Sequence, residues 1–274
     1  MKSPAPVATT DTLPVTITDI AYGGDGVGRL PDGITVFVPY AAVGDELLVL
    51  VHDRHKRFAR ARIAEIVKPG PGRTTPACPV YGRCGGCQYQ HLELPMQRQL
   101  KADQLVQLLQ RVGGLTEIPT PELLFTEAGY GYRNKLSLEA QATPPGGMAY
   151  YGMDAKDKVV ISDCPLAQAP LNARLAEWQA TPPPYPAGET VTLRADATGR
   201  VKAFVKQPSI KDPWLHERLM EREFLVPPAG FFQVNPPVVN AILAWLLADF
   251  AAEVAERGGT PGPLLDAYCG VGVF

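Results

Sequence analysis

The first part of the chain alternates apolar and polar residues in the pattern typical of half-buried β-strands. Turn residues separate the alternating runs, among them YGGDGVGRLPDG and VGDE. A further short strand fits around Gly26 to Leu30, which completes a set of five. Five short strands in so few residues predict a closed barrel of the OB type. The other four runs are VTITDIA (15–21), TVFVPYA (35–41), ELLVLVHD (46–53) and ARARIAEIV (59–67).

Residues 92–112 carry apolar side chains at helical spacing and are followed by Gly113 and Gly114, which predicts a helix that ends there. The sequence KPGPGRTTPA at 68–77 is rich in proline and glycine and is interpreted as a linker. Between 122 and 226 the strand pattern returns, interrupted by PPGG, TPPPYP and DATG. This region predicts a second unit that is rich in β-strands.

The last part of the chain has the pattern of an α/β domain. Asn235 can cap a helix whose first turn carries two prolines, followed by VVNAILAWLLADFAAEVAER. PLLDAYCGVGVF at 263–274 then predicts a buried strand that ends in Asp266 and a turn that contains Gly270 and Gly272. In open α/β sheets, small residues at this place let the backbone approach a nucleotide-like ligand. A structural turn explains an isolated G-x-G equally well.

These patterns together predict a multidomain chain. We expect an N-terminal OB-like all-β barrel at 13–68 and a central β-rich (α+β) domain at 69–229. Residues 230–274 are expected to begin a Rossmann-like α/β domain, which is truncated here because such a sheet needs further strands and helices. The helix at 92–112 is expected to pack on this last domain.

Composition places the chain among ordinary soluble globular proteins. It has 274 residues, a net charge of −2, 46% hydrophobic residues and 20% charged residues. The first residues, MKSPAPVATTDTLP, lack the apolar core of a secretory signal and predict a disordered tail. The longest apolar run, AILAWLLA at 241–248, is too short to span a bilayer. We therefore expect a cytoplasmic protein with no membrane partner, and a monomer.

Four of the five cysteines form a pattern typical of metal ligands. Cys78, Cys84 and Cys87 lie close together in CPVYGRCGGC, and Cys164 follows in ISDCPL. Thiolates from two distant segments hold a soft metal centre, and spacing alone leaves zinc and an iron–sulfur cluster equally open. A pair of disulfides is the alternative, which the lack of a secretory signal disfavours.

A second chemical signal is the basic segment RHKRFARAR at 54–62. In the predicted barrel it forms a loop and the edge of a strand, where guanidinium and ammonium groups can reach phosphates. Phe58 lies among them and can stack on an unpaired base. The alternative is a solvated hairpin without a partner. The basic residues that predict nucleic-acid binding are Arg54, Lys56, Arg57 and Arg60.

Several segments resemble one family in the same order along the chain. YGGDGVGR and TVFVPYAAVGDEL resemble a TRAM domain. CPVYGRCGGCQYQHL with the later DCPL resembles the iron–sulfur ligand set of the RNA uracil-C5 methyltransferases. GYRNKLSL at 131–138, GFFQVNP at 230–236 and LLDAYCGVGVF resemble further segments of these enzymes. The resemblance covers residues 13 to 274 and implies the N-terminal portion of such an enzyme.

The resemblance implies methylation of uridine C5 in RNA with S-adenosylmethionine as cofactor. TRAM domain plus cluster is the arrangement of the family's ribosomal-RNA enzymes, so 23S ribosomal RNA is the expected substrate. The implied ligands of a [4Fe–4S] cluster are Cys78, Cys84, Cys87 and Cys164. The implied S-adenosylmethionine site comprises Gln233, Tyr268, Asp266, Gly270 and Gly272. Arg133 is implied to touch RNA, although it and its neighbours Asn134 and Lys135 suit a packed strand equally well.

The family's reaction needs a cysteine thiolate that adds to uracil C6 and a glutamate base that removes the C5 proton. In the family both residues lie in the C-terminal part of the methyltransferase domain, and no residue of this chain matches them. We expect them beyond Phe274 and expect the isolated chain to be inactive. Cys269 is expected to be a small buried residue, and His216 to lie beside Glu217 in a surface helix.

Three alternatives stay open. The chain can be a truncated, non-catalytic RNA-binding iron–sulfur module, or it can belong to a tRNA uridine C5-methyltransferase. A radical or redox iron–sulfur enzyme is the third alternative. Such an enzyme would need a cluster with three cysteine ligands and an open iron site, whereas four candidate ligands are present.

Overall fold

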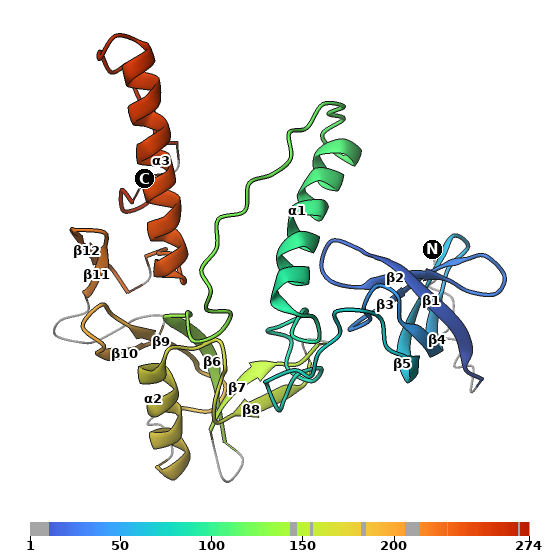
Figure 1. Cartoon of the computed structure of the whole chain (residues 1–274). Coiled ribbons are helices and arrows are strands. Elements are labelled where there is room, and N and C mark those ends of the chain that lie inside the picture. The colour runs from blue at the N-terminus through green and yellow to red at the C-terminus, as the bar shows by residue number, and fades with distance from the viewer. Residues whose placement is uncertain are drawn as a thin grey trace. The chain divides into compact units, whose positions relative to one another are not determined.

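The computed structural model describes residues 11–142, 147–153, 156–181, 185–205, 214–228, 230–267 and 269–273 (Figure 1). It contains two compact units, Met1–Leu123 and Leu124–Phe274. The sequence placed boundaries after residues 68 and 229, whereas the structure groups the barrel, the cysteine-rich segment and the first helix in one unit. Residues 1–10, most of the expected N-terminal tail, lie outside the described residues.

Five strands of the first unit close into a barrel, as their alternating pattern predicts. All neighbours are antiparallel except β3 and β5, which pair in parallel. Ile17, Val36 and Val49 are buried because period-two alternation sends every second side chain inward. The strands are β1 (Leu13–Ile20), β2 (Gly26–Arg29), β3 (Thr35–Val38), β4 (Glu46–Arg54) and β5 (Phe58–Lys68), in the order β1-β2-β3-β5-β4 around the barrel.

The close approach of β1 and β2 depends on Gly28. A Cβ atom at this position would lie 2.5 Å from Cγ1 of Val15 and 2.7 Å from the carbonyl oxygen of Thr16. Both distances are too short for any side chain to be accepted without moving the strands. Glycine therefore allows the two backbones to meet in the barrel wall.

The buried carboxylate of Asp45 attaches the segment after β5 to the barrel. It accepts hydrogen bonds from the backbone N–H groups of Ala42 (2.7 Å) and Gly70 (2.8 Å) and forms an ion pair with Arg73. Burial alone would raise the pKa of Asp45, but these hydrogen bonds outweigh it and hold the pKa below its usual range. The Pro/Gly-rich segment at 68–77 is thus fixed to the barrel instead of acting as a free linker.

Helix α1 (Leu94–Arg111) forms where the apolar spacing predicts it and contacts the barrel. Nε2 of Gln104 donates to the carbonyl oxygen of Ala21 at 3.0 Å, and Leu100 packs against the barrel core. The predicted packing of this helix on the residues after 229 stays a prediction. The first unit therefore combines the barrel, the cysteine-rich loop and α1.

The second unit is built on a five-stranded antiparallel sheet, which agrees with the predicted β-rich region. Helix α2 (Ala169–Ala180) contacts β7, β9 and β10 through buried residues that include Leu171 and Leu175. The strands are β6 (Lys135–Gln141), β7 (Gly147–Tyr151), β8 (Lys158–Ile161), β9 (Thr190–Ala195) and β10 (Val201–Phe204), and their order across the sheet is β10-β9-β6-β7-β8.

Strands β11 (Leu215–Leu219) and β12 (Arg222–Val226) form a separate two-stranded sheet. His216 lies in β11, so the surface helix expected around it is wrong. Buried and exposed residues alternate along LHERL, and this period of two, visible in the sequence, is the signal of a strand.

Helix α3 (Pro236–Glu256) begins at the predicted cap, where the side chain of Asn235 accepts a hydrogen bond from the N–H of Val238. Its apolar side chains are largely exposed, including Trp245 and Leu247. By length and composition α3 could cross a membrane, with a mean hydropathy of 1.7. The apolar run AILAWLLA at 241–248, from which no membrane span was expected, is shorter than α3 and did not predict a helix of membrane-spanning length. A single helix of this kind is weak evidence of a membrane span, because helices of soluble proteins pass the same test.

The buried strand expected to end in Asp266 is wrong, because residues 263–266 form no strand. Leu264 and Leu265 are 77% and 87% exposed. A parallel strand requires a hydrogen-bonded neighbour, and the described part of the chain provides none here. Cys269 is also exposed, which corrects the expectation that it is a small buried residue.

Replacing Asp45 by asparagine should destabilise the barrel by about 3 kcal/mol, because the amide leaves buried donors and the Arg73 guanidinium without a carboxylate. Hydrogen exchange of barrel peptides, measured by mass spectrometry in increasing urea, reports this free energy. The pKa of Asp45 is lowered by folding, so its stabilisation is complete above about pH 5 and is lost as the pH falls through the folded-state pKa. The difference between the wild type and D45N should therefore shrink in acid.

Glu46→Gln is the matched control for this substitution. Glu46 is the next residue and pairs with Lys68 at 3.0 Å, but both side chains are about half or more exposed. Losing this pair should change the stability by less than about 0.5 kcal/mol. Equal destabilisation by D45N and E46Q would contradict the role assigned to Asp45.

Candidate functional site

Three of the four predicted ligand cysteines lie in a tight loop of the first unit. The N–H of Tyr81 donates to the carbonyl oxygen of Cys78 at 3.1 Å, and the N–H of Cys84 donates to that of Val80 at 2.9 Å. These two bonds turn the backbone so that Cys78, Cys84 and Cys87, all half-buried, follow one another within a short loop.

Gln90 joins the two ends of this loop, a role that was not predicted from the sequence. Its side chain is buried, its Oε1 accepts a hydrogen bond from the N–H of Cys78 at 3.1 Å, and its Nε2 donates to Sγ of Cys87 at 3.3 Å. A donor directed at the sulfur favours the thiolate form of the cysteine. The only signal in the sequence is the position of a polar residue three places after Cys87.

His91 fastens the loop to the barrel. Its Nε2 lies 3.1 Å from the carbonyl oxygen of Ala41, and its Nδ1 lies 2.6 Å from the hydroxyl of Tyr81. Burial lowers the pKa of His91, which favours a neutral ring. A neutral ring that donates from Nε2 to Ala41 can accept a hydrogen bond at Nδ1 from the Tyr81 hydroxyl, which also lies 2.9 Å from the carbonyl oxygen of Gln88.

Tyr40 lies beside the same loop. Its backbone has a φ of 62°, and its ring contacts that of Tyr81 edge-on with centroids 5.0 Å apart. Its hydroxyl is buried and has no hydrogen-bond partner among the described residues. Burial, with a contribution from Cys84 and Cys87, raises the pKa of Tyr40 to about 12. The hydroxyl therefore stays protonated next to the cysteine loop.

Cys164 lies in the second unit, between β8 and α2. The side chain of Asn172 accepts from the N–H of Cys164 at 3.0 Å and donates to its carbonyl oxygen at 3.1 Å. Two residues further on, the carbonyl oxygen of Leu166 accepts from the N–H of Arg133 at 2.8 Å. The backbone at Cys164 is thus held by α2 and lies next to the segment GYRNK.

The residues fit a soft metal centre by their chemistry. They offer four half-buried cysteines, one of which receives a hydrogen bond at sulfur. Within the described ranges, however, no group of three or more His, Cys, Asp or Glu side chains is gathered as metal ligands would be. Ligation of one [4Fe–4S] cluster by all four cysteines therefore stays a prediction.

The hairpin of β4 and β5 carries the predicted RNA-binding residues of the first unit. Lys56 and Arg57 occupy its exposed tip and have no acidic partner in the part of the chain that the structure describes. The other two basic residues are paired, as Arg54–Asp32 and Arg60–Asp25 (3.5 Å). The tip is therefore the part of the hairpin that is most open to phosphate groups.

A buried polar cluster surrounds the segment GYRNK in the second unit. Arg194 and Glu217 form an ion pair with 3.2 Å between Nε and Oε1, and both side chains are almost completely buried. Nδ2 of Asn134 donates to the same oxygen of Glu217 at 3.4 Å. Burial raises the pKa of Glu217 to about 7, although Arg194 opposes this shift. Asn134 is thus buried and bonded to Glu217, whereas an RNA contact of Arg133 stays a prediction.

This cluster holds the segment that contains Gln233. The N–H of Asn134 donates to the carbonyl oxygen of Val234 at 3.1 Å, and the Arg194 guanidinium lies 5.3 Å from the ring centroid of Phe232. Gln233 itself is half-buried between these two anchored residues. No sequence pattern indicated the Arg194–Glu217 pair. Arg194 alternates with the apolar residues Leu193 and Ala195, and Glu217 was expected in a surface helix.

Two segments predicted to bind the cofactor meet at one apolar cluster. Phe232 belongs to this cluster, and Val271 and Val273 pack against it. The intervening Gly272 has a φ of 75°, and its N–H donates to the carbonyl oxygen of Cys269 at 2.8 Å, which makes a tight turn. The segment beside Gln233 and the glycine turn thus share one apolar cluster.

The other predicted cofactor residues are only partly accounted for. Gly270 has a φ of 58°, as the turn requires, and a Cβ atom at Gly272 would meet nothing within 4 Å. Gly272 therefore faces open space. Asp266 is exposed, and Tyr268 lies outside the described residues.

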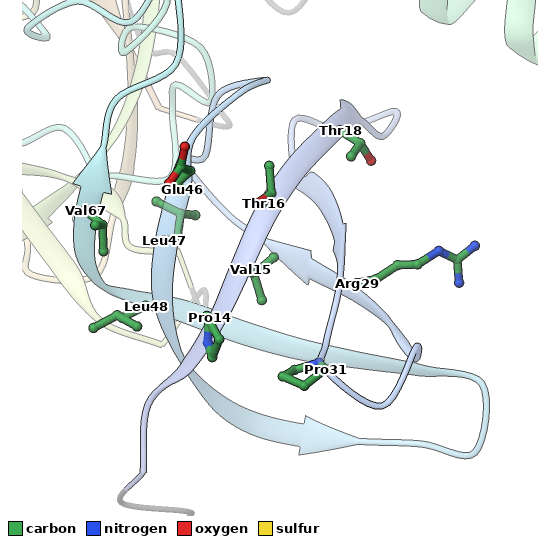
Figure 2. A pocket seen from close by; sticks show the side chains of 10 residues that line it. All are labelled: Pro14, Val15, Thr16, Thr18, Arg29, Pro31, Glu46, Leu47, Leu48 and Val67. Carbon is green, nitrogen blue, oxygen red and sulfur yellow. The ribbon is translucent and has the colours of Figure 1, made fainter.

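A groove of about 710 Å³ lies on the barrel surface in the first unit (Figure 2). Pro14, Pro31 and Leu48 are among its lining residues, and Arg29 extends away from them in this view. Its charged residues are engaged elsewhere, Arg29 with the carbonyl oxygen of Gly33 (2.9 Å) and Glu46 with Lys68. This groove offers little that could recognise a charged ligand.

Comparisons with known proteins agree with the sequence resemblance. Residues 7–64 match the family model described as TRAM domain. The chain is 40% identical to the 23S rRNA (uracil(1939)-C(5))-methyltransferase RlmD of Chromohalobacter salexigens over 97% of this chain and 63% of that protein. It is 30% identical to the protein of the same name from Halomonas elongata, over 94% of this chain and 62% of that protein.

The fold is also similar to a solved structure, the Pyrococcus abyssi tRNA (uracil-54, C5)-methyltransferase in complex with S-adenosyl-L-homocysteine. The TM-score is 0.64 at 22% identity, over 95% of this chain and 69% of that chain. The chain spans less than two thirds of the length of both RlmD relatives. The chain contains a TRAM domain and is similar along almost its whole sequence to these RNA uracil-C5 methyltransferases.

Proposed function

We propose that this protein transfers a methyl group from S-adenosylmethionine to C5 of a uridine in 23S ribosomal RNA. The observation that carries this proposal is the 40% identity to a 23S rRNA uracil-C5 methyltransferase over 97% of the chain. The similarity covers 97% of this chain and 63% of that relative. We further propose a cytoplasmic monomer.

Gln233 and the turn at Gly270 and Gly272 are proposed to hold one side of S-adenosylmethionine. The cofactor supplies the electrophilic methyl group when it is bound. The turn presents backbone without side chains, which allows close approach of a ligand, and the buried Arg194–Glu217 pair keeps the segment beside Gln233 in place. In the family's chemistry a cysteine adds to C6 and a glutamate removes the C5 proton, and no residue of this chain is proposed for either step.

The exposed apolar side of α3 fits the same proposal. A methyltransferase domain of the Rossmann type packs its helices on a parallel sheet. We propose that Trp245 and Leu247 are covered by such packing and that α3 is not a membrane span.

The four predicted cysteines are proposed to ligate a [4Fe–4S] cluster with a structural role. Support comes from the tight loop at Cys78 to Cys87, the Gln90 hydrogen bond to sulfur and the Asn172 clamp at Cys164. A structural metal centre stabilises the segments that bind it, because its binding free energy adds to folding. A cluster with four protein ligands leaves no open iron site, which disfavours the radical-enzyme alternative.

The methylation proposal is tested with the purified protein and unmodified 23S ribosomal RNA. With S-adenosylmethionine labelled in the methyl group, label in 5-methyluridine, identified by mass spectrometry of RNA digests, is the expected result, and it would overturn the inactivity that the sequence predicted for the isolated chain. Unmodified tRNA in a parallel reaction tests the tRNA alternative. Labelling of tRNA alone would overturn the choice of substrate. RNA binding without transfer to either RNA would instead favour a non-catalytic module.

Anaerobically purified protein should be brown and contain iron and sulfide, with broad absorption in the visible range. Cys164→Ser should lose most of this absorption and become more sensitive to proteolysis around 80–90. Cys269→Ser is the matched control, because this exposed fifth cysteine is outside the proposed ligand set, and it should retain the full iron content. A colourless protein with stoichiometric zinc, or equal iron loss in both variants, would contradict the cluster.

RNA binding should depend on salt through the tip of the β4–β5 hairpin. Lys56→Ala with Arg57→Ala should reduce the slope of log affinity against log salt by about 1.4 to 1.8, since each phosphate that is no longer neutralised lowers the slope by about 0.7 to 0.9. Lys68→Ala, which removes an exposed cation at the other end of β5, is the control and should leave the slope unchanged. Fluorescence anisotropy of labelled RNA between low and moderate salt measures both slopes, and an unchanged slope in the double variant would show a solvated hairpin.

A further inference from the structure

The face of the barrel made by β3 and the start of β5 carries a row of aromatic and cationic side chains. The rings of Phe37 and Phe58 lie 6.0 Å apart in an edge-on arrangement. The guanidinium of Arg60 lies over both rings, 5.9 Å from the centroid of Phe37 and 6.0 Å from that of Phe58. The ring of His55 stacks on that of Phe58, with centroids 4.4 Å apart and 27° between the planes. The row therefore leads from the hairpin tip onto β3.

The row continues into a groove of about 320 Å³ between the barrel and α1. Phe37 belongs to both the row and the groove. Tyr22, in the turn between β1 and β2, lines the groove and is 76% exposed, although it is a large aromatic residue. Arg111, at the end of α1, lines it from the helix side. The volume is near the lower limit of about 300 Å³ for small-ligand pockets.

The position of α1 distinguishes this groove from an open barrel surface. The Gln104 side chain bonds the carbonyl oxygen of Ala21, one residue before Tyr22, so α1 and the β1–β2 turn are fixed to each other. In OB-type barrels the face of strands 2 and 3, with the loops before strand 2 and after strand 4, is where oligonucleotides bind. Here the helix adds a wall to that face.

We propose that this groove holds one unstacked base of single-stranded RNA, stacked on Tyr22, while the adjoining nucleotides lie on Phe37, Arg60 and Phe58. The inference deepens the proposed function and rests on it. Stacking on aromatic rings accepts any base, and the flanking cations Arg111 and Arg60 neutralise phosphates on either side. Asp19, which lines the groove, and Asp25, the partner of Arg60, limit the positive charge, so stacking supplies more of the affinity here than at the hairpin tip.

The occupant is single-stranded RNA and not an apolar peptide because of the chemistry of the lining. Arg111 and Gln107 line the groove with Asp19 and the two aromatic residues, and such side chains can pair with the polar edge of a base. A purely apolar helix or strand would bury these groups without partners.

Tyr22→Ala tests the groove by its effect on affinity and on salt dependence separately. It should weaken binding of a single-stranded uridine-containing oligonucleotide by about tenfold, since the stacking partner is removed, and leave the salt slope unchanged. Tyr22→Phe keeps the ring and should retain wild-type affinity within about twofold. Lys56→Ala with Arg57→Ala should instead flatten the slope of log affinity against log salt. Anisotropy titrations with the same oligonucleotide measure the affinity and the salt slope of the wild type and of the three variants.

Val67→Ala is the matched control, because Val67 is 57% exposed on the same barrel but lines the groove of Figure 2. It should bind RNA like the wild type, and circular dichroism should show that both variants are folded. Equal affinity of Y22A and wild type, equal weakening by V67A, or failure of wild type to bind single-stranded RNA would overturn the inference. If Y22A binds RNA with unchanged affinity and still forms 5-methyluridine, the inference about the groove is wrong but the proposed function stands.

Discussion

The buried carboxylate of Asp45 is the constraint on which the first unit depends. A carboxylate excluded from water is stable only when donors surround it, and here the donors come from Ala42, Gly70 and Arg73. Two of these lie beyond the last barrel strand, so satisfying one charge fixes the path of the chain after β5. His91 then adds a second attachment at Ala41. The cysteine loop and α1 are therefore positioned by the barrel and do not depend on a flexible linker.

A buried charge has the same effect in the second unit. Arg194 and Glu217 come from β9 and β11, which belong to different sheets, and their ion pair joins these sheets around Asn134. The cluster leaves Oδ1 of Asn134 and Nη2 of Arg194 without hydrogen-bond partners among the described residues. Such incomplete satisfaction lowers stability, and it lies next to the segment proposed to bind the cofactor. The unsatisfied atoms thus lower the stability of this cluster, while its ion pair fixes the segment that contains Gln233.

The elements with regular periods could be predicted from the sequence, and the long-range attachments could not. Five alternating runs predicted the barrel, and helical spacing with flanking glycines or a capping asparagine predicted α1 and α3. The strand at 263–266 was predicted from its apolar composition, but a strand also needs a neighbour. The bonds of Asp45 to Arg73 and of His91 to Ala41 join residues 28 and 50 positions apart, and no local pattern reports such pairs. The cysteines stood out by their spacing, whereas the amides that hold them, Gln90 and Asn172, did not.

Those two amides make the cysteine segments sensitive to chemical ageing. Asn172 donates from Nδ2 to the carbonyl oxygen of Cys164, and Gln90 donates from Nε2 to the sulfur of Cys87. Deamidation replaces each donor nitrogen with an acidic oxygen. An oxygen would then face another oxygen at Cys164 and a thiolate at Cys87, and two attractive contacts would become repulsive. A stored sample could thus lose the geometry of its cysteine loops while every cysteine remains intact.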